Sequence, residues 1–265
     1  MKKLLILSLL LSGLNLLGQP SYYTTANVHS HNDYEQKTPF WLAYNENFGS
    51  MEADIFLQNG ELLVGHEKKD LVSHRTLEEY YLRNLQHCIE KNDNHPYADT
   101  SRKLQLLIDI KTDSIATLDK LVEILKKYPT LINSPSVTFV ITGNRPAASR
   151  FAGYPSFIYF DGVLSQSYSQ EAFKKIVLMS DDFKTYSQWN GKGIVPAKEW
   201  TVLKSAVDKA HSLKKPVRFW NAPDFINAWY QFMHLGVDYI NTDHIAEISA
   251  FLDKLPKTSY SSGSN

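Results

Sequence analysis

The chain has 265 residues, of which 43% are hydrophobic, and this is enough to build the core of one large domain. Its 28 basic and 28 acidic residues balance exactly in number, so no positive field is present that would collect nucleic acid. The single cysteine, Cys88, has no partner for an intramolecular disulfide, and its helical context predicts a buried structural thiol.

Residues 1–19 have the pattern of a secretory signal peptide. A basic start, "MKK", precedes the apolar run "LLILSLLL", and small residues with a proline follow in "GQP". The apolar run is short for a membrane span, and an uncleaved N-terminal anchor is the alternative. We therefore expect export to the periplasm or the extracellular space. Residues 20–257 are then expected to form one domain, and residues 258–265 a disordered polar tail.

Eight β-prone runs follow in chain order: residues 26–31, 50–56, 104–111, 136–142, 156–162, 175–181, 216–222 and 237–243. A hydrophobic period of 3.6 predicts helices in five intervals: 76–91, 115–127, 200–213, 224–235 and 245–255. The fourth, fifth and sixth connections are shorter or irregular. The turn signal "QNGE" after the second run predicts a small hairpin arm. Strands that alternate with helices indicate a parallel sheet, and eight of them predict a single (β/α)8 TIM barrel of the α/β class.

Nearly every predicted strand finishes in polar or ionisable residues. A barrel gathers the carboxyl ends of its strands at one face, so catalytic groups are expected there. The informative case is Asp109, which stands inside the apolar run "LLIDIK". A buried carboxylate needs a partner, and a metal or another cation is the natural one.

Three carboxylates and one amide form a candidate metal site. Glu52 and Asp54 share one face of their strand, because side chains alternate with a period of two, and they repel each other unless a cation lies between them. Asp109 and the neutral oxygen of Asn32 complete an all-oxygen ligand set that suits Ca²⁺ or Mg²⁺. Lys111 lies on the same strand face as Asp109 and can reach an anionic substrate group. The alternative is an ion-pair network without a metal.

The segments "SHNDY", "MEADIF", "VGH" and "LLIDIK" together resemble the superfamily of phosphatidylinositol-specific phospholipases C and glycerophosphodiester phosphodiesterases. The resemblance implies a barrel of this phosphodiesterase type, with His31 and His66 as its catalytic histidines and Lys111 beside the metal. Its metal ligands would be the four oxygen donors Asn32, Glu52, Asp54 and Asp109.

Within the superfamily, the "HSHNDY" start resembles a branch that includes fungal proteins linked to mitochondrial inheritance. The His-Arg-Gly start and the Pro-Glu-Asn-Thr stretch of the glycerophosphodiesterases are missing. Asp109 replaces their glutamate, as in spider-type sphingomyelinase D enzymes, whose late tryptophan is matched by Trp220.

The activity that the resemblance implies is hydrolysis of a phosphodiester, with a phospholipid headgroup or a glycerophosphodiester as substrate. One histidine would remove a proton from the attacking hydroxyl and the other would protonate the leaving oxygen, with the two roles unassigned. We expect a monomer, with transient contact to a membrane surface as an option. A barrel that binds phosphorylated ligands without turnover is the alternative. A metal-dependent hydrolase of another kind of bond is less consistent with the sequence, because such sites need further histidines and the later predicted strands lack them.

Several further residues have two readings. His29 shares the strand face of His31, so it either holds a phosphate or a carboxylate or is a core histidine. His66 is either catalytic or a surface histidine. Trp220 and Asn221 either contact the substrate or serve packing and backbone hydrogen bonding. Asp243 is expected to be structural, with pairing to a lysine or histidine at the barrel mouth as the other option.

Overall fold

The computed structural model describes residue 20 and residues 22–256. The predicted signal peptide (1–19) and the predicted tail (258–265) lie outside the described residues, so both stay predictions. Within the described part, no helix is long and apolar enough to cross a membrane.

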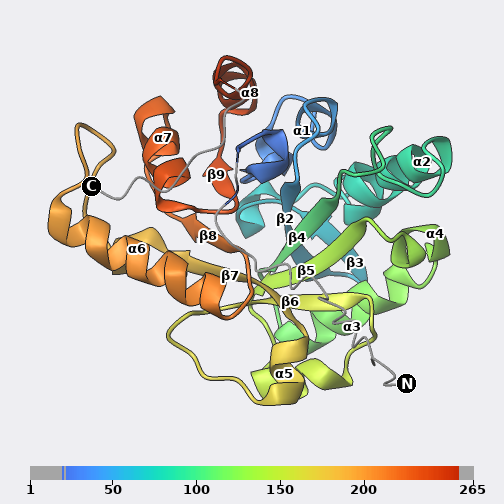
Figure 1. The fold of residues 1–265 in the computed structure, drawn as a ribbon. Coiled ribbons are helices and arrows are strands. Elements are labelled where there is room, and N and C mark those ends of the chain that lie inside the picture. Colours follow the sequence, from blue (N-terminus) through green and yellow to red (C-terminus); the bar gives the residue numbers. More distant parts are fainter. Residues whose placement is uncertain (1–19, 21, 257–265) are drawn as a thin grey trace, which may run out of the picture.

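Eight parallel strands form a nearly closed barrel, as predicted (Figure 1). In spatial order they are β8 (Val217–Trp220), β7 (Ile176–Asp182), β6 (Ile158–Gly162), β5 (Val137–Gly143), β4 (Leu104–Ile110), β2 (Ser50–Gln58), β1 (Val28–Ser30) and β9 (Ile240–Thr242). The two ends of this order meet through one isolated parallel bridge between Arg218 and Tyr239. All eight predicted β runs are therefore barrel strands.

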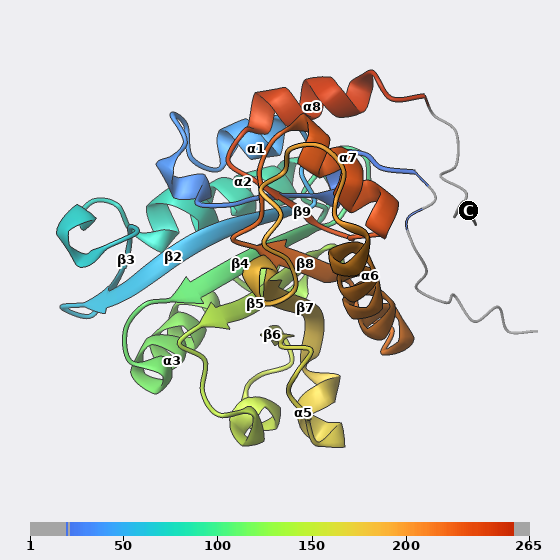
Figure 2. The same cartoon turned by 90° about the vertical axis from the view of Figure 1, so that its left-hand side faces the viewer.

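The predicted hairpin arm is also present. Strand β3 (Glu61–Val64) pairs antiparallel with the end of β2, which extends beyond the neighbouring strands (Figure 2). The turn residues Asn59 and Gly60 have φ angles of 52° and 82°, the left-handed backbone that a two-residue hairpin turn requires.

Helices surround the outside of the barrel (Figure 1). They are α1 (Trp41–Asn45), α2 (Arg83–Lys91), α3 (Ser114–Leu125), α4 (Pro129–Asn133), α5 (Gln170–Lys174), α6 (Ala197–Ser212), α7 (Ile226–Leu235) and α8 (Ile245–Asp253). All five predicted helical intervals are helical, and α2 is preceded by a wider π-helical segment, Glu78–Leu82. The connection from β5 to β6 contains only a short 3₁₀ segment, Ala148–Gly153, and α5 is a single short helix. This confirms the irregularity expected in that part of the chain.

The inner and outer faces of the barrel are packed differently. Outward-facing residues such as Met51 and Ile108 belong to the main core, which lies between the strands and the helices. The inner face has a small separate apolar cluster of Leu107, Val140 and Leu178. The strand register places Glu52 directly beside Leu107, so polar and apolar side chains are neighbours at this level inside the barrel.

Candidate active site

A cavity of about 610 Å³ opens at the carboxyl ends of the strands. It collects residues that lie far apart in the chain, and seven of the predicted site residues line it: His31, Asn32, Glu52, His66, Asp109, Lys111 and Trp220. Asp54 is 1% exposed and contacts the Lys111 side chain from within the barrel wall. The structure thus brings together the predicted catalytic and metal-binding residues, with His29 and Asn221 outside the cavity lining.

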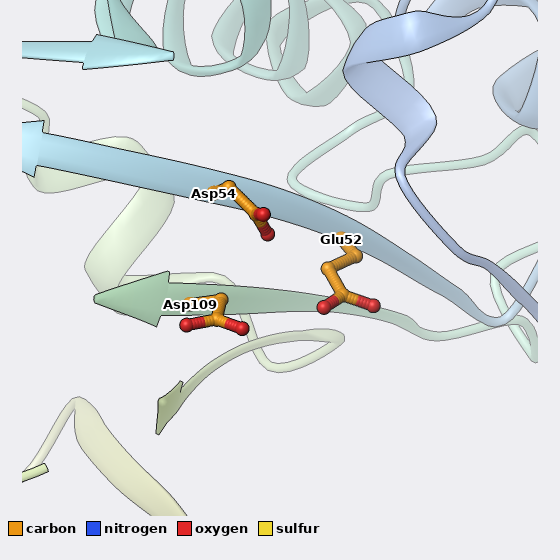
Figure 3. Close-up of side chains that lie close together, drawn as sticks. All are labelled: Glu52, Asp54 and Asp109. Carbon is orange, nitrogen blue, oxygen red and sulfur yellow. The ribbon is translucent and has the colours of Figure 1, made fainter. Parts of the chain in front are cut away.

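Three carboxylates converge inside the barrel. Glu52 and Asp54 come from β2 and Asp109 from β4, where Asp109 is the direct register partner of Asp54; Figure 3 shows all three side chains on the same side of these strands. One oxygen from each residue lies within 4.8 Å of the others. Burial, together with the charges of Glu52 and Asp109, raises the pKa of Asp54 to about 7. Three like charges are therefore held together at a cost.

Asp54 and Asp109 each use one oxygen for contacts with the protein and leave the other without a partner. Glu52 Oε2 contacts Arg218, while Asp54 Oδ2 and Asp109 Oδ2 each lie 2.9 Å from Lys111 Nζ. Asp54 Oδ1 and Asp109 Oδ1 are buried and have no hydrogen-bond partner among the described residues. Buried unsatisfied oxygens are rare in folded proteins, and a hard divalent cation would satisfy them.

The ion pairs expected for a network without a metal are therefore present. They leave carboxylate oxygens available for a cation as well. Three carboxylates face two permanent cations, Lys111 and Arg218, which leaves one negative charge in excess. The residues fit a divalent ion held by the free carboxylate oxygens. Asn32, in the left-handed conformation at φ 44°, lines the cavity, and its Oδ1 contacts the same Tyr34 hydroxyl as Asp54 Oδ2.

Gly143 shapes this site. It ends β5 with a φ of 69°, and a Cβ at this position would overlap Asp109 Oδ1 and crowd the Ile110 carbonyl. Only glycine leaves both the backbone conformation and the Asp109 oxygen undisturbed.

Arg218 is a site residue that the sequence analysis missed. It is 3% exposed, projects from β8 into the barrel and lines the cavity floor. Burial would raise the pKa of Glu52, but the Arg218 charge and a hydrogen bond with His29 hold it well below its ordinary value. The signal was available: Arg218 stands inside the apolar run "PVRFW", as Asp109 stands inside "LLIDIK".

His29 lies beneath the cavity and has no surface exposure. Its Nδ1 lies 2.7 Å from Ser50 Oγ, and its Nε2 lies 2.8 Å from Glu52 Oε2. Burial and the nearby Arg218 charge lower the pKa of His29 to about 4, so the ring is neutral at pH 7. A neutral ring with its proton on Nε2 accepts from Ser50 and donates to Glu52. This position favours the reading in which His29 holds a carboxylate.

His31 is paired with a carboxylate from the opposite end of the chain. Its Nδ1 lies 2.8 Å from Asp243 Oδ1, just beyond β9. Burial lowers the pKa of His31, but the Asp243 hydrogen bond and the charge of Glu52 outweigh burial and raise it. Asp243 thus fixes the ring orientation, which matches the reading in which it pairs with a histidine at the barrel mouth.

Tyr34 connects His66 to the carboxylates. Its hydroxyl oxygen lies 2.8 Å from Asp54 Oδ2, 2.9 Å from Asn32 Oδ1 and 3.2 Å from His66 Nδ1. With one proton, the hydroxyl can donate to one carboxylate or amide oxygen while it accepts from an Nδ1–H of His66. The His66 side chain is 50% exposed, so its ring is open to the cavity.

Trp220 and Asn221 lie at and just beyond the end of β8. Trp220 is 41% exposed and lines the far wall of the cavity. The Asn221 amide instead donates to the side-chain oxygen Oδ1 of Asp182 at 3.0 Å, which is neither a backbone hydrogen bond nor a contact with the cavity. The same wall includes an ion pair between Arg145 and Asp161 that sequence reasoning did not identify as part of the site.

The raised pKa of Asp54 predicts how stabilisation by a divalent ion depends on pH. The folded metal-free protein holds the Asp54 proton more tightly than the unfolded chain, so this group's contribution to stability decreases as the pH rises from about 4 to about 7. An ion that replaces this proton should raise the melting temperature more at pH 8 than at pH 5. Thermal denaturation with Ca²⁺ or Mg²⁺ against EDTA measures this difference.

The control for that measurement is Asp54→Asn. This variant should be more stable than the wild type at pH 8 in EDTA, and it should lose most of the response to the ion. Equal ion-induced shifts of the wild-type melting temperature at the two pH values would contradict the assignment.

Gly143→Ala should weaken binding of the cation, because the added methyl group displaces the Asp109 carboxylate. We expect a loss of about tenfold or more in affinity, in line with a strain of about 1–3 kcal/mol. Isothermal titration calorimetry with Ca²⁺ or Mg²⁺ measures this affinity. Gly60→Ala is the matched control, since Gly60 also has a positive φ of 82° but nothing within 4 Å of the added Cβ. If both variants bind the ion equally well, Gly143 has no part in the site.

Two family models and a solved structure match this chain. The model of the AIM6-like phosphodiesterase domain matches residues 22–148, which include the three carboxylates and both catalytic candidates. The model of the glycerophosphoryl diester phosphodiesterase family matches residues 216–246. A solved glycerophosphodiester phosphodiesterase from Parabacteroides distasonis has the same fold, with a TM-score of 0.55 and 15% identity over 85% of this chain and 96% of that chain.

Fungal proteins match most of this chain. Altered inheritance of mitochondria protein 6 from Eremothecium gossypii is 30% identical, over 84% of this chain and 69% of the relative. Its homolog from Arthroderma benhamiae is 27% identical, over 82% of this chain and 81% of the relative. The chain therefore belongs to the AIM6-like phosphodiesterase family, within the superfamily of glycerophosphodiester phosphodiesterases and phosphatidylinositol-specific phospholipases C.

Proposed function

We propose that this protein is a metal-dependent phosphoric diester hydrolase that acts on a phospholipid headgroup or a glycerophosphodiester. The observation that carries the proposal is the arrangement of the three carboxylates, of which Asp54 and Asp109 each have a buried oxygen without a partner. They lie in one cavity with two histidines, His31 and His66, and with Lys111.

The charge of the cavity floor supports an anionic substrate. With a divalent ion added, the three carboxylates, Lys111 and Arg218 would carry one net positive charge. A phosphodiester carries one negative charge, so the occupied site and the substrate complement each other. The bound ion would supply electrostatic stabilisation of the charge that develops on the phosphate oxygens.

The two histidines supply proton transfer. Asp243 holds Nδ1 of His31, so its Nε2 is the nitrogen left for proton transfer to or from the substrate. Tyr34 holds Nδ1 of His66 in the same way. One ring takes the proton of the attacking hydroxyl, from water or from the substrate itself, and the other gives a proton to the leaving oxygen. Lys111 lies where its ammonium can contact a phosphate oxygen.

Binding of a phosphorylated ligand without turnover is the alternative function. A binding function requires the cation and Lys111. It gives no role to His31 and His66. The presence of both histidines, each with a partner at Nδ1, favours turnover.

Hydrolysis of bis(p-nitrophenyl) phosphate is the direct test. We expect release of p-nitrophenolate in Ca²⁺ or Mg²⁺ and a loss of nearly all of it in EDTA, with recovery when the ion is restored. Activity that persists in EDTA would contradict the metal assignment. Absence of turnover across a panel of glycerophosphodiesters and phospholipids would favour the binding function. Phosphorus NMR of the products separates hydrolysis from cyclisation.

Removal of either histidine should nearly abolish turnover. His31→Ala and His66→Ala are each expected to lower kcat by a factor on the order of 10²–10⁴, because each deletes one proton-transfer group. Asp243→Asn should lower kcat less, since it leaves the ring in place but weakens its orientation. His87→Ala, an exposed histidine on α2, is the control and should keep wild-type turnover. Circular dichroism checks that each variant is folded; wild-type kcat in either active-site variant would rule out the pair.

A further inference from the structure

One nitrogen of the Arg218 guanidinium, Nη2, takes no part in holding Glu52. Its Nε donates to Ser180 Oγ at 3.1 Å, and its Nη1 donates to Glu52 Oε2 at 3.1 Å and to Asn241 Oδ1 at 2.9 Å. Nη1 also lies 2.6 Å from His29 Nε2. No hydrogen bond involves Nη2 within the part of the chain that the structure describes. Holding Glu52 therefore occupies one side of the guanidinium only.

Nη2 belongs to a side chain that lines the cavity. Arg218 is 3% exposed overall and is nevertheless part of the cavity lining, so the little surface that it has faces the cavity. A buried guanidinium is costly unless its N–H groups are paired. The Nη2 donors lack a protein partner and therefore require one from the cavity, and a phosphate oxygen is the strongest available acceptor.

Arg218 and Lys111 approach the cavity from different walls of the barrel. Lys111 follows β4, whereas Arg218 projects from β8, which is separated from β4 by three strands in each direction around the sheet. A phosphate at the carboxylate cluster can thus be contacted by an ammonium and by a guanidinium from separate directions. The guanidinium is planar, so one group can hold Glu52 and a phosphate oxygen at the same time.

We propose that Arg218 binds the substrate phosphate through Nη2 while Nη1 holds Glu52, which makes it a further substrate-binding residue of this site. This inference rests on the proposed phosphodiesterase function. A lysine at the same position could hold Glu52 or contact the phosphate but could not do both with the same geometry.

The test is Arg218→Lys, measured with two probes at saturating Mg²⁺ or Ca²⁺. Dimethyl phosphate, an unreactive diester, reports phosphate binding by phosphorus NMR titration, and the ion itself reports the carboxylate site by calorimetry. We expect the affinity for dimethyl phosphate to fall by about tenfold or more, as for loss of a charge-assisted hydrogen bond, with ion affinity within about threefold of the wild type. For bis(p-nitrophenyl) phosphate, kcat/KM should fall by a similar factor.

The outcomes separate this proposal from the proposed function. A wild type that turns over no diester removes the proposed function, whereas dimethyl phosphate binding can still be measured in that case. Unchanged dimethyl phosphate affinity in Arg218→Lys overturns the role of Arg218. So does a loss of ion affinity that accounts for the whole effect, because Arg218 would then only position Glu52.

Two further variants complete the experiment. Arg83→Lys changes an exposed arginine that pairs with Glu79 and should leave both affinities unchanged. If Arg218→Lys does not fold, Ser180→Ala replaces it. This variant keeps the Arg218 charge and removes only the acceptor of Nε, so the guanidinium is less well oriented. It should weaken dimethyl phosphate binding by about threefold, and no change would again overturn the proposal.

Discussion

The site depends on three carboxylates that are kept close together inside the barrel against their mutual repulsion. Glu52 and Asp54 occupy the same face of one strand, and Asp109 is the register neighbour of Asp54 on the next. Lys111 and Arg218 neutralise part of this charge from different strands, and each uses only one oxygen of the carboxylates that it contacts. One oxygen of each carboxylate lies within 4.8 Å of the others, a spacing that suits ligands of one divalent cation.

The barrel supports this cluster by placing apolar and polar groups on different parts of its inner wall. Leu107, Val140 and Leu178, from β4, β5 and β7, form the apolar cluster. On β1 and β2, Ser50, His29 and Glu52 form a continuous chain of hydrogen bonds, and Gln105 of β4 extends the chain by donating to Ser50. Because side chains in a closed barrel have little room to move, the network holds Glu52 in one orientation. The catalytic candidates at the mouth then rest on a rigid base.

The relation to the solved glycerophosphodiester phosphodiesterase is one of shared fold. The first half of the chain supplies the carboxylates and both histidines, and the last part supplies Arg218, Trp220 and Asp243. The two matching family models cover these two parts separately. The far wall includes Trp220, which lies in the second matched segment, and the ion pair of Arg145 and Asp161, of which Asp161 lies outside both segments.

Much of the fold and half of the site could be read from the sequence alone. Periodicity is a local property, so the eight strands, the main helices and the hairpin at Asn59 and Gly60 follow from neighbouring residues. The same holds for Glu52 and Asp54, whose spacing of two places them on one face. A charged residue inside an apolar strand, as at Asp109, indicates an inward-facing group.

Only the tertiary structure decided which of these groups meet. Arg218 and Glu52 are 166 residues apart, and His31 and Asp243 are 212 apart, so no local pattern relates them. Their pairing follows from closure of the sheet, which places β9 beside β1 and directs β8 toward the same interior. Closure also assigned His29 to the interior and turned Asn221 toward Asp182. The physical reason is that strand spacing determines which face a residue occupies, whereas barrel closure determines its neighbours across the interior.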